Sequence, residues 1–68
     1  MPNSVYKIIE VVGSSPESWE KAAKNAIEVA SESLRDLRIA EVTMLDIHMI
    51  DGAMTYRAKL KLSFKIVK

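Results

Sequence analysis

The fold is decided by the last quarter of the chain, residues 51–67, DGAMTYRAKLKLSFKIV. From residue 54 to residue 67, apolar and polar side chains alternate, and this pattern predicts a long β-strand with one apolar face. A second strand-like segment covers residues 37–51, and the turn signal Asp51–Gly52 joins the two into a predicted hairpin. The apolar face of the last strand consists of Tyr56, Ala58, Leu60, Leu62, Phe64 and Ile66.

The register of this hairpin follows from the position of its turn. A tight turn at residues 52–53 pairs Asp51 with Met54, and counting back from there assigns every other pair. Apolar pairs then share one face of the hairpin and polar pairs share the other. The expected apolar pairs are Leu45–Leu60, Ile47–Ala58 and Met49–Tyr56, and the expected polar pairs are Asp46–Lys59 and His48–Arg57.

The second face of the hairpin is too apolar to be left in water. Besides its polar pairs, it is expected to carry Val42, Met44 and Ile50. A chain of 68 residues buries only roughly 60% of the surface that its unfolded form exposes, and one helix covers only one face of a sheet. We therefore expect the chain to associate with copies of itself.

The first half of the chain predicts a strand followed by a helix. Residues 5–12, VYKIIEVV, are rich in β-branched side chains and end at a glycine, as strands often do. Ser15 and Pro16 suit the N-cap and the first position of a helix that runs to about Asp36. Because its inner face is mostly alanine, this helix is expected to lie close to the sheet. That face consists of Trp19, Ala23, Ala26, Ile27, Ala30 and Leu34.

The inventory of reactive side chains is poor. The chain has no cysteine, which excludes disulfides, thiolate zinc sites and cysteine nucleophiles. His48 is the only histidine, and no serine or acid is placed to form a triad with it. Two glycines, Gly13 and Gly52, do not make a phosphate-binding loop. We expect a single α+β domain over residues 1–68, in the order β-α-β-β, that is not an enzyme.

The charges nearly cancel, but they are unevenly distributed. Residues 1–51 hold five basic and nine acidic side chains, whereas residues 52–68 hold five basic and no acidic ones. The basic end could meet nucleic acid or the acidic part of a neighbouring copy, and we favour the copy. The stripe of Lys59, Lys61 and Lys65 has no exposed aromatic side chain interleaved with it, so it lacks a stacking platform for bases.

Membrane insertion and export are not expected from the sequence. No run of about 18 apolar residues is present. The first residues, MPNS, lack the charged start and apolar core of a signal peptide. We therefore expect a cytoplasmic protein with no membrane partner.

In this order, the segments resemble the dodecin family. VYKIIEVVGSSPESW (5–19) is similar to the opening of a dodecin, and the alanine-rich segment 22–30 and YRAKLKLSFK (56–65) fit its helix and last strand. Between them, Glu41–Val42 is followed ten residues on by Asp51–Gly52–Ala53. The resemblance implies a three-stranded antiparallel sheet partly wrapped round one helix. It also implies a trimer-based homododecamer, a hollow shell that stores or quenches flavins at subunit interfaces.

Two positions depart from the flavin-binding pattern of the family. Typical dodecins carry a tryptophan two residues before the glutamate that matches Glu41, and here Ile39 takes its place. They also carry a glutamine that bonds the flavin edge, and here that position is Arg57, whose charge suits a phosphate or carboxylate better. Both changes weaken the case for FMN, FAD or riboflavin. The resemblance still implies that the small ligand lies near Ile39, Arg57, Arg38 and Glu41.

Simple strand alternation separates the two substituted positions. It predicts that Ile39 and Arg57 point to opposite faces of their own sheet. They can then share a ligand only if a bulge turns one of them round or if they come from different copies.

The substituted positions also suggest another ligand. LRIA (37–40), together with Tyr56–Arg57, resembles the calcium dodecins, a tryptophan-lacking subgroup described as binding calcium instead of flavin. The alternative to a flavin store is therefore a calcium-binding or purely structural shell. The first candidate metal ligands are Asp46 and Asp51, followed by Glu10 and Glu41. A site of this kind would gather one acid from each of several copies.

Overall fold

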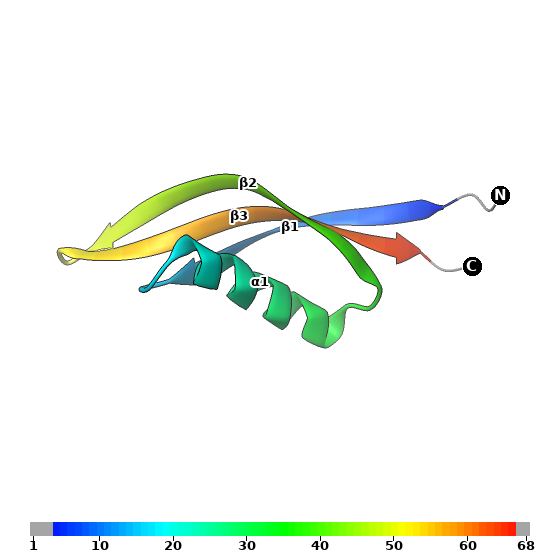
Figure 1. Cartoon of the computed structure of the whole chain (residues 1–68), viewed down its shortest axis with the longest axis horizontal. Helices are drawn as coiled ribbons and strands as arrows, with labels where there is room; N and C mark the ends of the chain where they lie inside the picture. Colours follow the sequence, from blue (N-terminus) through cyan, green and yellow to red (C-terminus); the bar gives the residue numbers. More distant parts are fainter. Residues whose placement is uncertain (1–3, 67–68) are drawn as a thin grey trace.

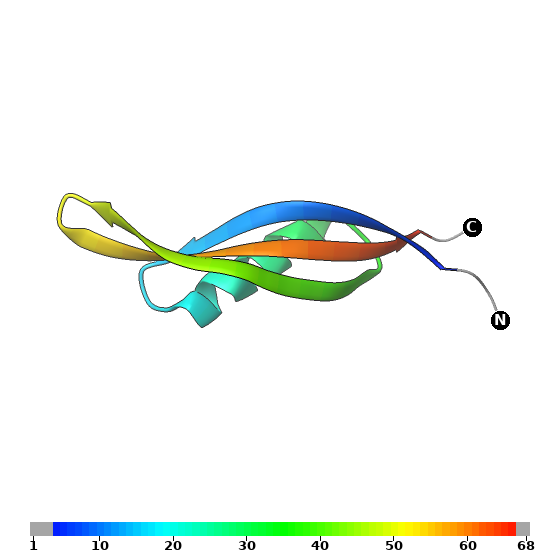
Figure 2. The same cartoon turned by 90° about the horizontal axis from the view of Figure 1, so that it is seen from above.

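The computed structural model describes residues 4–66 and contains three long strands and one helix (Figure 1). Strand β1 spans Val5–Ser15, helix α1 spans Trp19–Ser33, strand β2 spans Leu37–Ile50 and strand β3 spans Ala53–Ile66. The strands form one antiparallel sheet in the order β1-β3-β2. Figure 2 shows β3 between the other two strands, with the helix behind the sheet. The predicted α+β fold and the β-α-β-β order are confirmed.

The core lies between the middle of β3 and the alanine face of α1. Leu60 and Leu62 are fully buried, as the alternation of this strand predicts. From the helix, Ala22 and Ala26 are buried, although the predicted inner face did not include Ala22. The remaining buried apolar residues of this core are Ala58 and Phe64.

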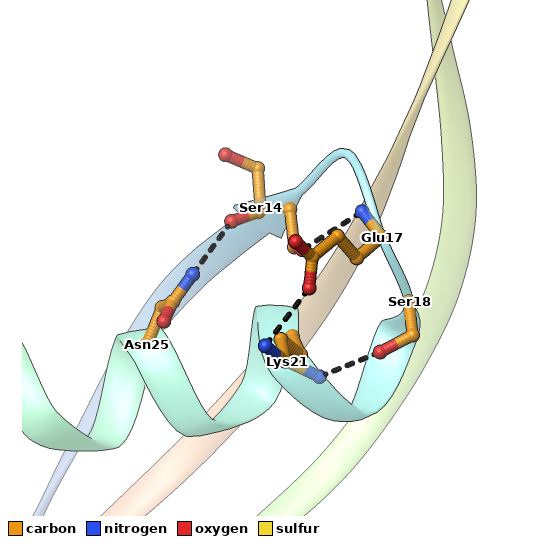
Figure 3. Close-up of polar contacts among 6 residues, drawn as sticks. Ser14, Glu17, Ser18, Lys21 and Asn25 are labelled. Atoms are coloured by element: carbon orange, nitrogen blue, oxygen red, sulfur yellow. Dashed lines mark hydrogen bonds and ion pairs between the residues drawn. The ribbon is translucent and has the colours of Figure 1, made fainter.

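The helix lies so close to β1 that one position of the strand must be a glycine. A Cβ atom placed on Gly13 would collide with the backbone oxygen of Ala22 and lie 2.8 Å from the Cβ of Ala26. The Nδ2 group of Asn25 donates a hydrogen bond of 3.2 Å to the backbone oxygen of Ser14, as Figure 3 shows. The small side chains of the helix therefore serve a close helix–strand contact, as the sequence predicted.

The helix begins three residues later than predicted. Strand β1 continues through Gly13 to Ser15, which is buried and lies opposite Tyr56 in the sheet. The N-cap is Ser18, whose hydroxyl accepts a 3.0 Å hydrogen bond from the backbone N–H of Lys21 (Figure 3). Both serines suit a cap, and the pairing of Ser15 with β3 decides between them.

The helix also ends before the predicted residue. Its last residue is Ser33, and Leu34 has an extended backbone whose N–H still bonds to the oxygen of Ala30. Asp36, with φ of 61°, then turns the chain into β2. At the other end of the sheet, the predicted last residue of β3, Val67, lies outside the described residues.

The hairpin turn lies one residue earlier than predicted. Asp51 and Gly52 have φ values of 48° and 80°, so both turn residues occupy the left-handed region that two-residue hairpin turns require. Every predicted pair therefore moves by two residues on β3, while each side chain keeps its face. Asp46 lies opposite Arg57 instead of Lys59, and His48 lies opposite Thr55 instead of Arg57. The observed apolar pairs are Leu45–Ala58, Ile47–Tyr56 and Met49–Met54.

Two bulges in β2 overturn the simple alternation. The pairing shifts at Thr43, whose hydroxyl donates a 3.1 Å hydrogen bond to the backbone oxygen of Lys59, and again at Arg38. Because of the bulge at Thr43, Val42 lies opposite Leu60, on the helix side of the sheet, and not on the second face. Ile39 lies between the two bulges, on the face that points away from the helix, whereas simple alternation predicted the helix side.

Candidate functional site

The face of the sheet that points away from α1, here called the outer face, carries most of the predicted site residues. Residues paired across antiparallel strands share a face, and the buried residues of β3 assign the opposite parity to the outer face. The outer face includes Ile8, Glu10 and Val12 of β1, Arg57, Lys59, Lys61 and Ser63 of β3, and Ile39, Glu41, Met44, Asp46 and His48 of β2.

Apolar and charged rows alternate along the outer face. Each row runs across all three strands, and the side chains at the ends of the apolar rows are more than half exposed. In one charged row, Lys61 has Glu10 on one side and Glu41 on the other. The neighbouring rows are Ile8–Ser63–Ile39 and Val12–Lys59–Met44.

The strongest polar contact on the outer face joins Asp46 to Arg57. The Nε and Nη2 groups of Arg57 donate hydrogen bonds of 2.7 and 2.6 Å to the two carboxylate oxygens of Asp46. This two-pronged geometry combines charge with directional bonding. The hydrogen bonds from Arg57 lower the pKa of Asp46, and those same bonds raise the pKa of Arg57. Both side chains remain about two-fifths exposed.

The backbone of Asp46 makes a second contact, with the start of the helix. The Nε1 group of Trp19 donates a 3.0 Å hydrogen bond to the backbone oxygen of Asp46. The indole ring also meets the ring of Tyr56 edge-on, with centroids 5.1 Å apart. The sequence placed Trp19 on the inner face of the helix, but nothing in it indicated this partner on β2.

Two hollows share Val12 in their linings. One of about 170 Å³ lies on the outer face and is lined by Val12, Met44, Asp46, Arg57 and Lys59. The other, of about 400 Å³, lies between β1 and α1 and has no charged residue in its lining. Its lining residues are Val11, Val12, Gly13, Ser14, Asn25, Ala26, Val29 and Ala30.

The predicted ligand-binding residues do not come together within one chain. Ile39 lies opposite Ser63, six residues from Arg57 along β3, which corresponds to about 20 Å of strand. Arg38 occupies the bulge near the start of β2, and Glu41 lies in the charged row beside Lys61. A ligand that touches both Ile39 and Arg57 would have to lie between copies of the chain.

The predicted metal ligands are equally dispersed. Among residues 4–66, no three histidine, aspartate or glutamate side chains lie close enough together to hold a metal ion. Arg57 occupies both carboxylate oxygens of Asp46, and Asp51 lies in the hairpin turn. Glu10 and Glu41 are separated by β3, so their backbones are roughly 9–10 Å apart. Calcium takes six to eight oxygen ligands, and the described part of one chain does not supply them.

A scan against family models gives a match named Dodecin over residues 5–67. The chain belongs to the dodecin family. Dodecins are small-ligand binders and not enzymes, so the expectation of a non-enzymatic protein is confirmed. They typically form homo-oligomers. In the described part of this dodecin, no helix is both long enough and apolar enough to cross a membrane.

The relatives of this dodecin include a calcium dodecin and a dodecin named without a ligand. A Mycobacterium tuberculosis protein named calcium dodecin is 47% identical over 64 residues, which cover 93% of this chain and 90% of that protein. Its crystal structure, described as calcium chelating with a novel calcium-binding site, matches with a TM-score of 0.86 at 46% identity, covering 94% of this chain and 93% of that chain. A Streptomyces coelicolor dodecin matches with a TM-score of 0.90 at 38% identity, over 100% and 99% of the two chains.

Proposed function

We propose that this dodecin assembles into a homo-oligomeric shell that binds calcium between its copies. The observation that carries the proposal is the 47% identity, over 93% of this chain, to a protein named calcium dodecin. Flavin storage, which the family resemblance implies by default, has less support. The calcium-binding shell, which the sequence offered as the alternative, has more.

The apolar rows of the outer face support self-association. Ile8, Val12 and Ile39 are each 58% exposed in the single chain, and Met44 is 55% exposed. Apolar patches of this kind are characteristic of surfaces that another protein covers. The charged row in which Glu10 and Glu41 flank Lys61 suits a mixed-charge partner better than nucleic acid. We expect the trimer-based homododecamer that the family resemblance implies.

The calcium ligands should come from more than one copy. One chain offers isolated carboxylates on an exposed surface, and a symmetric assembly multiplies each of them around an axis. Asp51, Glu10 and Glu41 are the candidates, because their carboxylates have no ion-pair partner among residues 4–66. Calcium bound there would supply positive charge that holds the carboxylates of several copies together.

The same residues argue against a flavin. Ile39 provides no aromatic ring for stacking, which removes about 0.5–1.5 kcal/mol beyond the loss of contact area. Two of the five N–H donors of Arg57 bond to Asp46. Arg57 also carries a fixed charge at a position where the flavin pattern has a neutral amide.

Light scattering and calorimetry test the proposal on the same sample. After treatment with a chelator and dialysis, we expect an assembly far larger than a monomer and a saturable calcium titration. Magnesium at equal concentration should give a weaker signal, because it demands a tighter octahedral site. FMN fluorescence should remain unquenched. A flat calcium trace with fully assembled protein, or a monomer at micromolar concentration, would contradict the proposal.

A further inference from the structure

We infer that Asp46 serves as the centre of a clamp that ties α1 to both strands of the hairpin, and not as a calcium ligand. The clamp consists of Trp19, Asp46, Tyr56 and Arg57. The statement that Asp46 is not a calcium ligand rests on the proposed function. The clamp itself rests on contacts within one chain.

The side chain of Asp46 is committed to Arg57. Both carboxylate oxygens accept short hydrogen bonds from the guanidinium group, at 2.7 and 2.6 Å. A calcium ion at this carboxylate would have to approach a fixed positive charge or displace it. Lys59, which lines the same hollow, adds a second positive charge close by. Among the candidate acids, Asp46 is therefore the one least suited to a dication.

The backbone oxygen of Asp46 bonds to the helix, which lies on the opposite side of the sheet from Arg57. Its carbonyl oxygen accepts the indole N–H of Trp19, the first residue of α1. The indole in turn meets Tyr56, which precedes Arg57 on β3 and points to the other face. One residue of β2 is thus joined to β3 on the outer face and to the helix on the inner face.

The clamp also distinguishes the observed register from the neighbouring one. A slip of two residues would keep every face and place Lys59 opposite Asp46, as the sequence alone suggested. A lysine has one ammonium group and cannot form the planar two-pronged bond that arginine forms. The clamp therefore favours the register in which Arg57 faces Asp46, and an Arg57→Lys variant should lose this preference despite keeping the charge.

The experiment compares Asp46→Asn with a matched control, Asp36→Asn, which makes the same change in the loop before β2. Trp19 is the only tryptophan of the chain, so tryptophan emission reports on the clamp alone. In the assembled protein we expect Asp46→Asn to keep the calcium stoichiometry, with affinity within about twofold. Its emission should shift and its melting temperature should fall. The control should change none of these values.

Loss of calcium binding in Asp46→Asn, with the assembly intact, would overturn the inference. If that variant does not assemble, the wild-type protein gives the answer. Calcium at saturation should leave the Trp19 emission unchanged. An emission change that saturates at the calcium-binding stoichiometry would indicate that calcium binds Asp46 and would overturn the inference.

If the wild-type protein binds no calcium, the proposed function fails while the clamp is still tested. The melting-temperature losses of Asp46→Asn and Arg57→Gln should then be non-additive in the double variant, because both changes break one contact. Additive losses would refute the clamp.

Discussion

Ile39 and Arg57 lie on the same face of the sheet, six residues of β3 apart. Regular alternation would put them on opposite faces, but the bulge at Thr43 reverses the faces of residues 39–42, and the bulge at Arg38 restores the original alternation at Leu37. The distance of about 20 Å along the strand is larger than a flavin ring system. Within one chain, the two positions cannot line the same pocket.

This relationship predicts the behaviour of a variant that restores the flavin pattern. Ile39→Trp combined with Arg57→Gln should gain flavin binding only in the assembled protein, where different copies can bring the two positions together. FMN fluorescence should be quenched by the assembly and not by protein dissociated in mild denaturant. An intact assembly without quenching would mean that the interface pocket itself differs from that of flavin-binding dodecins.

Gly13→Ala should destabilise the chain by about 1–3 kcal/mol, because the new methyl group overlaps the backbone of α1 and forces the helix away from β1. Thermal or denaturant unfolding measures the loss. The control is Ser14→Ala, in the next residue of the strand, which should change the free energy of unfolding by less than about 0.5 kcal/mol. Equal stability of Gly13→Ala and the wild-type protein would show that the helix has room to move.

Asp51 allows the turn and the calcium site to be tested separately. Its φ of 48° is tolerated by asparagine but not by β-branched residues. Asp51→Val should therefore cost roughly 1–3 kcal/mol of stability, whereas Asp51→Asn should leave the melting temperature nearly unchanged. If Asp51 contributes to the calcium site, Asp51→Asn lowers calcium affinity in calorimetry without lowering stability. A stable Asp51→Val variant would contradict the turn geometry.

The Asp46–Arg57 pair should also leave a signature in the pH dependence of stability. Arg57 lowers the pKa of Asp46 in the folded chain below its usual value of 3.8, so folding favours the ionised carboxylate. The resulting contribution is fully present above about pH 4 and disappears as the pH falls through the lower, folded-state pKa. Melting temperatures of wild type and Asp46→Asn should therefore converge in acid. A constant difference between them down to the lowest pH would argue against the pair.

Much of the fold could be predicted because alternation and turn chemistry are local. The strand order along the chain, the buried face of β3 and the alanine contact of the helix all follow from such patterns. The position of the N-cap does not, because Ser15 and Ser18 are both good caps and only the pairing of Ser15 with Tyr56 excludes the first. The bulge at Thr43 has no local signature, since threonine also suits a regular strand.

The site was less predictable than the fold. The sequence identified Asp46 and Arg57 as separate candidates, for a metal and for a ligand, and the two-residue error in register hid their contact. Trp19 reaches Asp46 from 27 positions away in the sequence, and no periodicity reports such a contact. Sites that are completed by other copies depend on the symmetry of the assembly, which alternation and spacing within one chain do not reveal.

The bulges of β2 also affect whether the sheet could grow by the addition of strands from further chains. The order β1-β3-β2 leaves each outer strand with one edge that no strand of residues 4–66 covers. Straight strands of such length would offer a template to which further chains could add one after another, as in amyloid. The interruptions at Arg38 and Thr43 bend β2, so an added strand would lose its register after a few residues. Open-ended fibres are thereby disfavoured, which is compatible with the closed shell proposed above.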